Sequence, residues 1–252
     1  MSYMRLTLVA DHFQYLSDIS IIAFLCAAGT LFYRKLSPAL KPAIIGAVVL
    51  LIGAFTLYSW DRVKIYNGEF TLWADTLSKN PNAWQAHNHM GAVLFMQSSE
   101  YRRRNQMNEA NKLLQEATFH FSESCRLKPE NPESHNNLGL GYISMGRMEE
   151  GVAEYRRAIQ IRNWEPSMHT NLGNALGQMK RYDEAMREYK EALRLNPQDA
   201  ASRCNLGYVY LQIGRLDDAI LELQRALAVD PNMQQARQNL DAALQMRNGG
   251  AH

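Results

Sequence analysis

The feature that most constrains this chain is a tripeptide that returns at a fixed interval. Asn-Leu-Gly begins at Asn137, Asn171 and Asn205, and the pattern returns once more at Asn239, where aspartate stands in place of the glycine. This interval of about 34 residues is typical of a helix–turn–helix unit that is stacked repeatedly. Because one such unit cannot bury its apolar face alone, neighbouring units must pack against one another. The sequence therefore predicts an all-α array of antiparallel helix pairs.

A second pattern, in phase with the first, indicates how each unit packs. Ala185 is followed by Tyr189 and then by Ala192, a small–large–small series spaced by four and three residues, which falls on one helix face. The neighbouring units repeat it as Gly151, Tyr155 and Ala158, and as Ala219, Leu223 and Ala226. Pro197 and Pro231 follow these series and predict the points where one helix ends and the next begins.

These positions closely resemble the tetratricopeptide repeat. The resemblance implies an α-solenoid, a right-handed superhelix of antiparallel helix pairs. The usual tryptophan of the family is replaced by His135, His169 and Arg203. The predicted parts of the array are a partial repeat helix (61–83), a repeat with a 14-residue insertion (84–131), three regular repeats (132–165, 166–199 and 200–233) and a capping helix (234–247). The insertion falls around YRRRNQMNEANKLL and is interpreted as a lengthened helix or a loop.

The same resemblance places a concave binding groove along the first helix of each unit. The predicted groove residues, most of them amides, hydroxyls or apolar side chains, are Asn88, His89, Phe95, Asn136, Asn137, Leu140, Ile143, Ser144, Thr170, Asn171, Asn174, Gln178, Asn205, Tyr208, Leu211 and Gln212. Neutral amides bond to the backbone of an extended peptide whatever its side chains, so proteins or peptides are the predicted partners. The alternative is that the asparagines only satisfy neighbouring helices. The groove positions lack the lysine and arginine with which chaperone-binding members clamp a C-terminal carboxylate, so that function is disfavoured.

Residues 1–60 are predicted to form a membrane anchor with two transmembrane helices, at about 13–33 and 42–60. Both segments match the length of about 20 helical residues that a bilayer core requires. A cleaved signal peptide is the alternative for the first segment. It fits poorly because the apolar run starts late and Arg34 and Lys35 follow it directly.

The loop between the two segments, RKLSPALK, carries three positive charges and no negative one. By the positive-inside rule this loop is cytoplasmic. Both termini and the array are then predicted on the periplasmic side of a bacterial inner membrane. The predicted partners accordingly include the lipid bilayer and other membrane subunits.

The charge balance argues against nucleic acid as a partner. After Trp60 the chain carries 23 basic and 23 acidic residues, so the array has no cationic footprint for a phosphate backbone. The sequence also singles out no nucleophile–base–acid set, and we therefore expect no enzymatic activity. A repeat protein can in addition self-associate through the ends of its array.

No metal site or cofactor is predicted from the sequence. The cysteines, which form no CxxC pair and no cluster of ligands, are Cys26, Cys125 and Cys204. The histidines at equivalent positions of successive units, His87, His135 and His169, are expected to lie too far apart to share one metal ion and to pack at the repeat surface.

A second resemblance covers the order of segments in the whole chain. It is similar to the C-terminal part of polytopic membrane proteins with tetratricopeptide tails, among them O-mannosyltransferase-like glycosyltransferases. Asp11, Tyr15 and Leu16 match the pattern before a late membrane span in that family, but His12 stands where arginine is usual. The early acidic loop that carries catalysis in those enzymes has no counterpart here.

Two functions therefore follow from the sequence. The first is a membrane-anchored, non-enzymatic scaffold or assembly subunit whose repeats bind proteins or peptides beside a membrane complex. The second is the repeat-bearing, substrate-presenting part of a split membrane glycosyltransferase, whose catalytic core is a separate chain.

Overall fold

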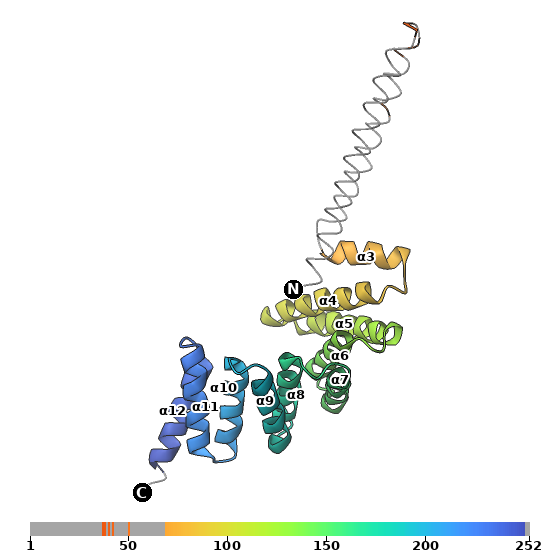
Figure 1. Cartoon of the computed structure of the whole chain (residues 1–252). Helices are drawn as coiled ribbons and strands as arrows, with labels where there is room; N and C mark the ends of the chain where they lie inside the picture. The colour runs from red at the N-terminus through yellow and green to blue at the C-terminus, as the bar shows by residue number, and fades with distance from the viewer. Residues whose placement is uncertain (1–36, 39, 41, 43–49, 51–68, 250–252) are drawn as a thin grey trace. The chain divides into compact units, whose positions relative to one another are not determined.

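The computed structural model describes residues 37, 38, 40, 42, 50 and 69–249, and over 69–249 it is an array of ten helices without a strand (Figure 1). The chain divides into two compact units, Met1–Lys64 and Ile65–His252, and all ten helices lie in the second. In chain order they are α3 (Glu69–Lys79), α4 (Trp84–Arg103), α5 (Met107–Leu127), α6 (Pro132–Ser144), α7 (Met148–Ile161), α8 (Pro166–Gln178), α9 (Tyr182–Leu195), α10 (Ala200–Gln212), α11 (Leu216–Val229) and α12 (Gln234–Gly249).

The period of the sequence reappears in the starts of the helices. The first helices of three successive pairs begin at Pro132, Pro166 and Ala200. Proline suits a first helical turn because the backbone N–H it lacks has no partner there in any case. Just before α6 the side chain of Asn131 accepts a hydrogen bond of 2.9 Å from the backbone N–H of Glu133, which caps the helix.

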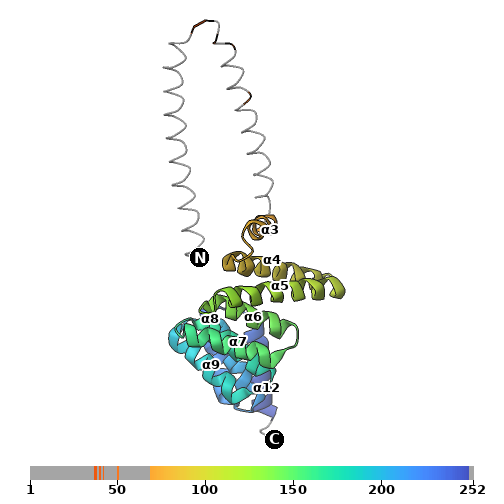
Figure 2. The same cartoon turned by 90° about the vertical axis from the view of Figure 1, so that its right-hand side faces the viewer.

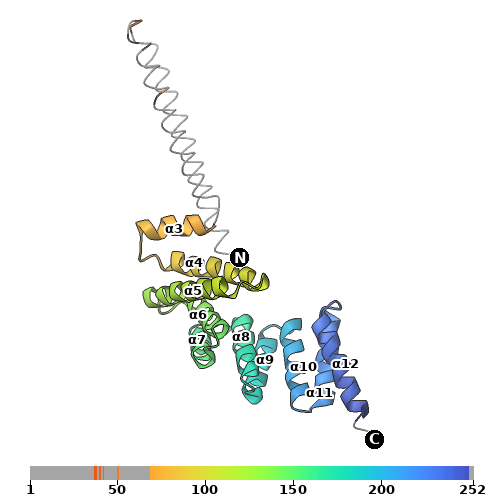
Figure 3. The same ribbon diagram turned by 180° about the vertical axis from the view of Figure 1, so that it is seen from behind.

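The helices pack in antiparallel pairs, and the pairs follow one another along the array. The pairs are α4–α5, α6–α7, α8–α9 and α10–α11, with α3 against α4 at one end and α12 against α11 and α10 at the other (Figures 1 and 3). The first helices of neighbouring pairs also contact one another, whereas no comparable contact joins successive second helices among the described residues. The first helices are therefore the closely spaced set, which places them on the inner side of the curved array.

Each repeated glycine lies where an aromatic or aliphatic side chain of the second helix presses on the first. A Cβ atom built on Gly139 would lie 2.8 Å from Tyr155 Cδ1, and one on Gly173 would lie 2.7 Å from Tyr189 Cε1. Real Cβ atoms do not come that close to ring carbons, so any larger residue would force the pair apart. The small and large positions of the sequence repeat are thus two halves of one contact.

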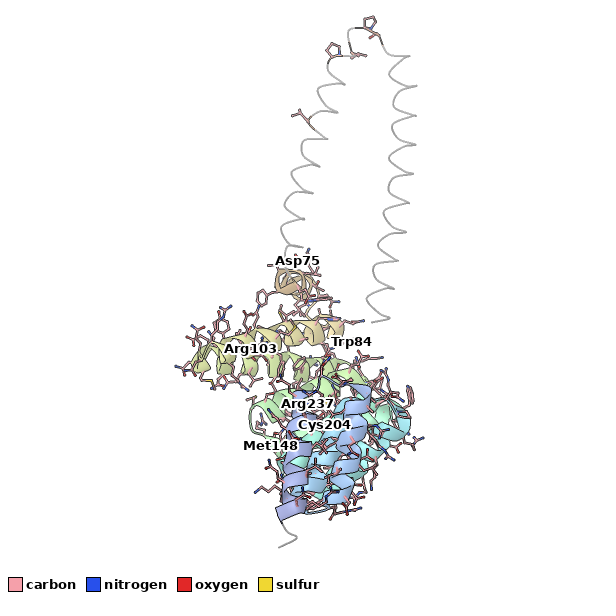
Figure 4. All side chains as sticks on the ribbon, turned by 90° about the vertical axis from the view of Figure 1, so that its left-hand side faces the viewer. Asp75, Trp84, Arg103, Met148, Cys204 and Arg237 are labelled. Atoms are coloured by element: carbon pink, nitrogen blue, oxygen red, sulfur yellow. The ribbon has the colours of Figure 1, made fainter. Side chains whose placement is uncertain are left out.

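The insertion in the first repeat lengthens both of its helices. Helix α4 has 20 residues where α6 has 13, and α5 has 21 where α7 has 14. Each helix is therefore longer by about two turns. Figure 4 labels Trp84 and Arg103 at the two ends of α4, and in Figure 2 this long pair lies between α3 and α6. The lengthened-helix interpretation of the insertion describes the structure, and the loop interpretation does not.

The structure corrects the predicted localisation. Across the described residues, no helix is both long enough and apolar enough to cross a bilayer. This finding contradicts the prediction of an integral protein of a bacterial inner membrane with a periplasmic array. The predicted lipid and membrane-subunit partners are therefore unsupported. The two predicted spans, 13–33 and 42–60, lie outside the described residues except for Pro42 and Leu50.

Candidate binding groove

The first helices are joined to one another by hydrogen bonds between asparagine side chains. Asn137 Nδ2 donates to Asn88 Oδ1 over 3.0 Å, across α6 and α4. Asn171 donates to Asn136 in the same way over 3.0 Å, whereas Asn205 donates over 2.8 Å to Asn174, because the position equivalent to Asn136 is Thr170 in that repeat. The asparagines of the Asn-Leu-Gly motif therefore stabilise the stacking of neighbouring units, as the alternative interpretation of these residues expected.

The predicted groove residues differ widely in their exposure. Two of them, Asn88 and Leu211, are buried, and four are exposed: His89, Gln178, Tyr208 and Gln212. The partly buried members are Phe95, Asn136, Asn137, Leu140, Ile143, Ser144, Thr170, Asn171, Asn174 and Asn205. The exposed members gather toward the C-terminal half of the array, apart from His89, whose ring stacks on Trp73 of α3 with 4.4 Å between the centroids.

The apolar members of the set turn toward the core rather than the inner surface. Leu211 is part of the main hydrophobic cluster, and Leu140 and Ile143 pack against it. Ile143 lies directly over Gly151, where an added Cβ atom would come within 2.6 Å of its side chain. The Thr170 hydroxyl is likewise engaged, at 2.7 Å from Ser202 Oγ. These residues therefore contact neighbouring helices behind the groove surface.

The structure brings five of the predicted residues together around one cavity of about 470 Å³. They are Asn174, Gln178, Asn205, Tyr208 and Gln212, from α8 and α10. Lys180, Tyr182, Tyr189 and Gln235, which the sequence did not single out, complete its polar lining. Lys180 supplies a positive charge in the turn after α8, so this part of the groove is not purely neutral. In the sequence, Lys180 occupies the same repeat position as Gly146 and Gly214, and the repeat predicts a turn at that position.

A second hollow, of about 600 Å³, lies along the longer first pair. Phe95 is the one predicted residue that lines it, beside Met96, Glu100 and Arg103 of α4 and Glu69 of α3. Met96 exposes 68% of its surface. This hollow exists because α4 extends about two turns beyond the length of a regular repeat helix.

The position that usually holds tryptophan in this repeat type makes the same two polar contacts in successive pairs. His135 Nε2 lies 2.8 Å from the carbonyl oxygen of Pro129, and Nδ1 lies 2.6 Å from Glu154 Oε2. The corresponding contacts join His169 to Asn163 O and Glu188, and Arg203 to Pro197 O and Glu222. His135 and His169 are buried, so the expectation that they pack at the repeat surface was wrong. Each side chain ties a loop to its own helix pair.

Sequence reasoning missed that Cys125 belongs to one of these contacts. Cys125, His135 and Glu154 are all buried, and their ligand atoms lie within 4.8 Å of one another. The neighbouring thiol of Cys125 and the carboxylate of Glu154 raise the pKa of His135 to about 10, against the lowering effect of burial. The ring is thus held as a cation at neutral pH. The residues are far apart in sequence, and only the register of the repeat relates them.

Comparison with known proteins supports the fold from sequence and from structure. Tetratricopeptide-repeat models match residues 132–163, 173–214 and 200–233. No curated protein sequence matches the chain significantly. None of the matched family models describes a glycosyltransferase, so the resemblance to O-mannosyltransferase-like tails gains no support.

Solved structures with the same architecture include a crystal structure of MamA, with a TM-score of 0.55 at 16% identity, covering 69% of this chain and 94% of MamA. YrrB, described as a TPR protein with an unusual peptide-binding site, has a TM-score of 0.54 at 18% identity, covering 73% of this chain and 87% of YrrB. PilF of Pseudomonas aeruginosa has a TM-score of 0.53 at 19% identity, covering 65% and 71%. At these identities the likeness establishes the fold. The chain contains tetratricopeptide repeats, and they form the stacked helix pairs from α6 to α11.

Proposed function

We propose that this protein is a non-catalytic scaffold that binds an extended segment of a protein or peptide partner along its first helices. The observation that carries the proposal is the cavity of about 470 Å³ between α8, α10 and α12, where five predicted groove residues meet. An extended peptide is the shape that fits a groove running across successive helices.

The chemistry of the cavity fits a peptide backbone. Gln178 and Gln212 line it with amides, each able to donate and to accept a hydrogen bond. Tyr208 exposes 42% of its surface and offers a flat apolar face beside them. Amides that read the backbone and an aromatic ring that covers a side chain are the combination expected at a peptide site.

The non-catalytic part of the proposal rests on the same lining. The polar groups around this cavity are side-chain amides, phenol hydroxyls and the ammonium group of Lys180. These groups can bind and orient a partner, and this lining includes no carboxylate, imidazole or thiol. The description of YrrB as a peptide-binding repeat protein lends further support, because its fold covers most of this array.

The proposal is tested by selecting peptides from a displayed random library on the full-length protein and measuring the affinity of the selected peptides by fluorescence anisotropy. The variant Tyr208→Ala, combined with Gln212→Ala, should weaken binding at least about tenfold, or about 1.4 kcal/mol. Both side chains are exposed, so the fold should be unaffected.

The matched control is Leu221→Ala on α11. Leu221 exposes 45% of its surface but belongs to a second helix, away from the cavity lining. Affinity should be unchanged in this variant. Selected peptides that bind the Tyr208→Ala, Gln212→Ala protein as tightly as the unmodified protein would show that the cavity is not the binding site.

A further inference from the structure

Three helices converge on a buried cluster of three different side chains. Cys125 lies in the last turn of α5, His135 near the start of α6 and Glu154 in the middle of α7. Their relative exposures are 8%, 7% and 8%. One atom from each, a sulfur, a ring nitrogen and a carboxylate oxygen, lies within 4.8 Å of the other two. These are the three ligand types that zinc combines in proteins.

The hydrogen bonds of His135 show that a cation is required at its Nδ1 atom. Nε2 faces the carbonyl oxygen of Pro129 at 2.8 Å, and a carbonyl only accepts, so Nε2 carries a proton. Nδ1 faces Glu154 Oε2 at 2.6 Å, and an ionised carboxylate also only accepts. A lone pair on Nδ1 would therefore be repelled. Either a second proton or a metal ion must lie between the nitrogen and the carboxylate.

The other repeats keep the contact with the glutamate but have no third ligand beside it. In the next pair His169 faces Glu188 at 2.8 Å, and in the pair after that Arg203 provides a permanent positive charge against Glu222. The residues that correspond to Cys125 one and two repeats later are Ile159 and Leu193, which pack against the hydrophobic core. Among the described repeats, a thiol occupies this position only beside His135.

We propose that Cys125, His135 and Glu154 bind one divalent transition-metal ion, with zinc as the cation that fits best. With zinc bonds of about 2.0–2.3 Å, a tetrahedral site separates its ligand atoms by about 3.3–3.8 Å. The Nδ1–Oε2 distance of 2.6 Å must open to reach this separation, which requires the side chains of His135 and Glu154 to rotate. The fourth position is left for a water molecule.

The residues around the cluster hold the ligands as metal sites require. The Pro129 carbonyl fixes the ring so that Nδ1 is the coordinating nitrogen, and a backbone carbonyl is a usual partner for the second nitrogen of a metal-bound histidine. Arg157 Nη1 donates to Glu154 Oε1 over 2.7 Å, which leaves Oε2 for the metal. Both supporting contacts are already present in the protein.

The charges balance when the metal binds. Binding replaces the proton on Nδ1 of His135 and the proton on the thiol of Cys125, and two protons are released to solvent. The thiolate, the neutral imidazole and the carboxylate carry two negative charges, which the divalent ion neutralises. A neutral cluster is what a buried site of this kind favours.

The same geometry argues against a nucleophilic role for Cys125. In a thiol–imidazole–carboxylate triad one ring nitrogen serves the nucleophile and the other serves the acid. Here the backbone carbonyl of Pro129 occupies Nε2, so the ring cannot relay a proton between its two nitrogens. The three side chains are arranged to surround one point.

The test is a titration of the reduced, metal-free, full-length protein with Co²⁺ followed by absorption spectroscopy. A thiolate ligand gives an intense charge-transfer band in the near ultraviolet, and a tetrahedral site gives visible d–d bands. We expect one equivalent bound with a micromolar or tighter dissociation constant, displacement by one equivalent of Zn²⁺, and release of two protons per ion. Thermal unfolding should shift upward with added Zn²⁺, because the metal binds only the folded chain.

Four variants separate this site from other metal binding. Cys125→Ser and Glu154→Gln should each remove the thiolate band or weaken binding at least about tenfold. Cys204→Ser removes the other buried thiol among the described residues and should leave the titration unchanged. Ile159→Cys in the Cys125→Ser protein places a thiol beside His169 and Glu188 and should restore a band, because it rebuilds the same arrangement one repeat later.

The outcomes decide the proposal in either direction. Absence of the thiolate band in the unmodified protein, or its persistence in Cys125→Ser, overturns it. Loss of the band in Cys204→Ser with native circular dichroism also overturns it, since that result moves the site elsewhere. If Cys125→Ser fails to fold, Glu154→Gln and the Zn²⁺-dependent shift of the unmodified protein carry the test, and no shift counts against the proposal.

Discussion

The first helix pair and the later pairs each hold a loop carbonyl with one side chain, but the second partner of that side chain differs in charge. In α6–α7, α8–α9 and α10–α11, a His or Arg side chain bridges a loop carbonyl and a glutamate. In α4–α5, His87 Nε2 lies 3.0 Å from Pro81 O, but its Nδ1 lies 2.9 Å from Nδ1 of His120. His120 occupies the place of the glutamate once the insertion is counted. The comparison shows that every pair keeps the carbonyl contact, while the partner on the other side is a carboxylate in the later pairs and an imidazole in the first.

The two regions also differ in length and in their turns. The pair α4–α5 has the longer helices and turns through Asn105, at φ 60°. The later pairs turn through Gly146, Lys180 and Gly214, with φ between 57° and 78°. All four residues are left-handed, so the turn geometry is shared even where glycine is not. The long pair is thus a regular pair whose two helices are extended at the end where the turn joins them.

The prediction with the largest expected effect tests whether the long pair depends on the same core contact as the other pairs. Phe121 is 2% exposed and packs on Gly91, as Leu223 packs on Gly207 in the last pair. Phe121→Ala should lower the free energy of unfolding by about 3–5 kcal/mol through loss of burial and formation of a cavity. Urea denaturation followed by circular dichroism measures it. A loss below about 1 kcal/mol would mean that the extra turns hold the pair together without this contact.

A second prediction removes the charge from one of the later contacts. Glu222 is 9% exposed and accepts hydrogen bonds from Arg203 at 2.9 Å and Arg225 at 2.6 Å. Glu222→Gln should cost about 1.5–3 kcal/mol in urea denaturation, because two guanidinium groups lose a charged acceptor. Glu191→Gln, which disrupts an exposed pair with Arg194, is the matched control and should change little. Equal effects in both variants would remove the distinction between buried and exposed pairs.

The third prediction concerns pH and the histidine pair. Burial, together with the charge of His87, lowers the pKa of His120 to about 4, while nearby Glu123 acts in the opposite direction. The unfolded chain titrates near 6.5, so between about pH 6.5 and 4 it takes up more protons than the folded chain and stability falls as pH falls. Because the ring is partly exposed, the loss should be no more than about 1 kcal/mol. Urea midpoints at pH 7.5 and pH 5 measure it.

His120→Glu converts the first pair to the pattern of the later ones and serves as its control. The new carboxylate lies beside His87, so protonation of His87 should now stabilise the fold and the pH dependence across this window should weaken or reverse. An equal fall of the midpoint in both proteins would show that the histidine pair is not its source.

The smallest expected effect concerns the shared turn. Lys180 adopts φ 57°, a conformation that costs a residue with a Cβ atom about 1–2 kcal/mol. Lys180→Gly relieves that strain but gives the unfolded chain more freedom, so the net gain should be at most about 1 kcal/mol. Gly214→Ala makes the opposite change at φ 74° and should destabilise by a similar amount. Thermal melts resolve both, and effects of the same sign would contradict the argument.

The fold was largely predictable from the sequence, and the site only in part. The regular spacing of Asn137, Asn171 and Asn205 predicted stacked helix pairs, because a period read over three copies leaves few alternatives. The insertion was located, but a single sequence does not say that its length divides equally between two helices. The amide positions were identified, whereas their bonds to one another depend on the spacing of neighbouring first helices, which no local pattern encodes.

The cluster around His135 was missed for a related reason. Cys125 and Glu154 belong to different repeats and share no local motif. Aligning the repeats would have placed Cys125 opposite Ile159 and Leu193, and each glutamate at one constant offset from its His or Arg. The structure adds what that alignment lacks, namely that the end of one second helix meets the start of the next pair.

The regularity of the contacts between pairs has a consequence for how such a gene lengthens. An in-frame tandem copy of residues 166–199 would set the asparagine of the second copy against Asn174 of the first, as Asn205 is now. Its histidine, its glutamate and its proline would arrive already in register. Growth by whole repeats therefore needs no compensating substitution downstream of Pro132. A copy of the long pair α4–α5 inserted between two regular pairs would bring two helices whose extra turns have no equal partner on either side.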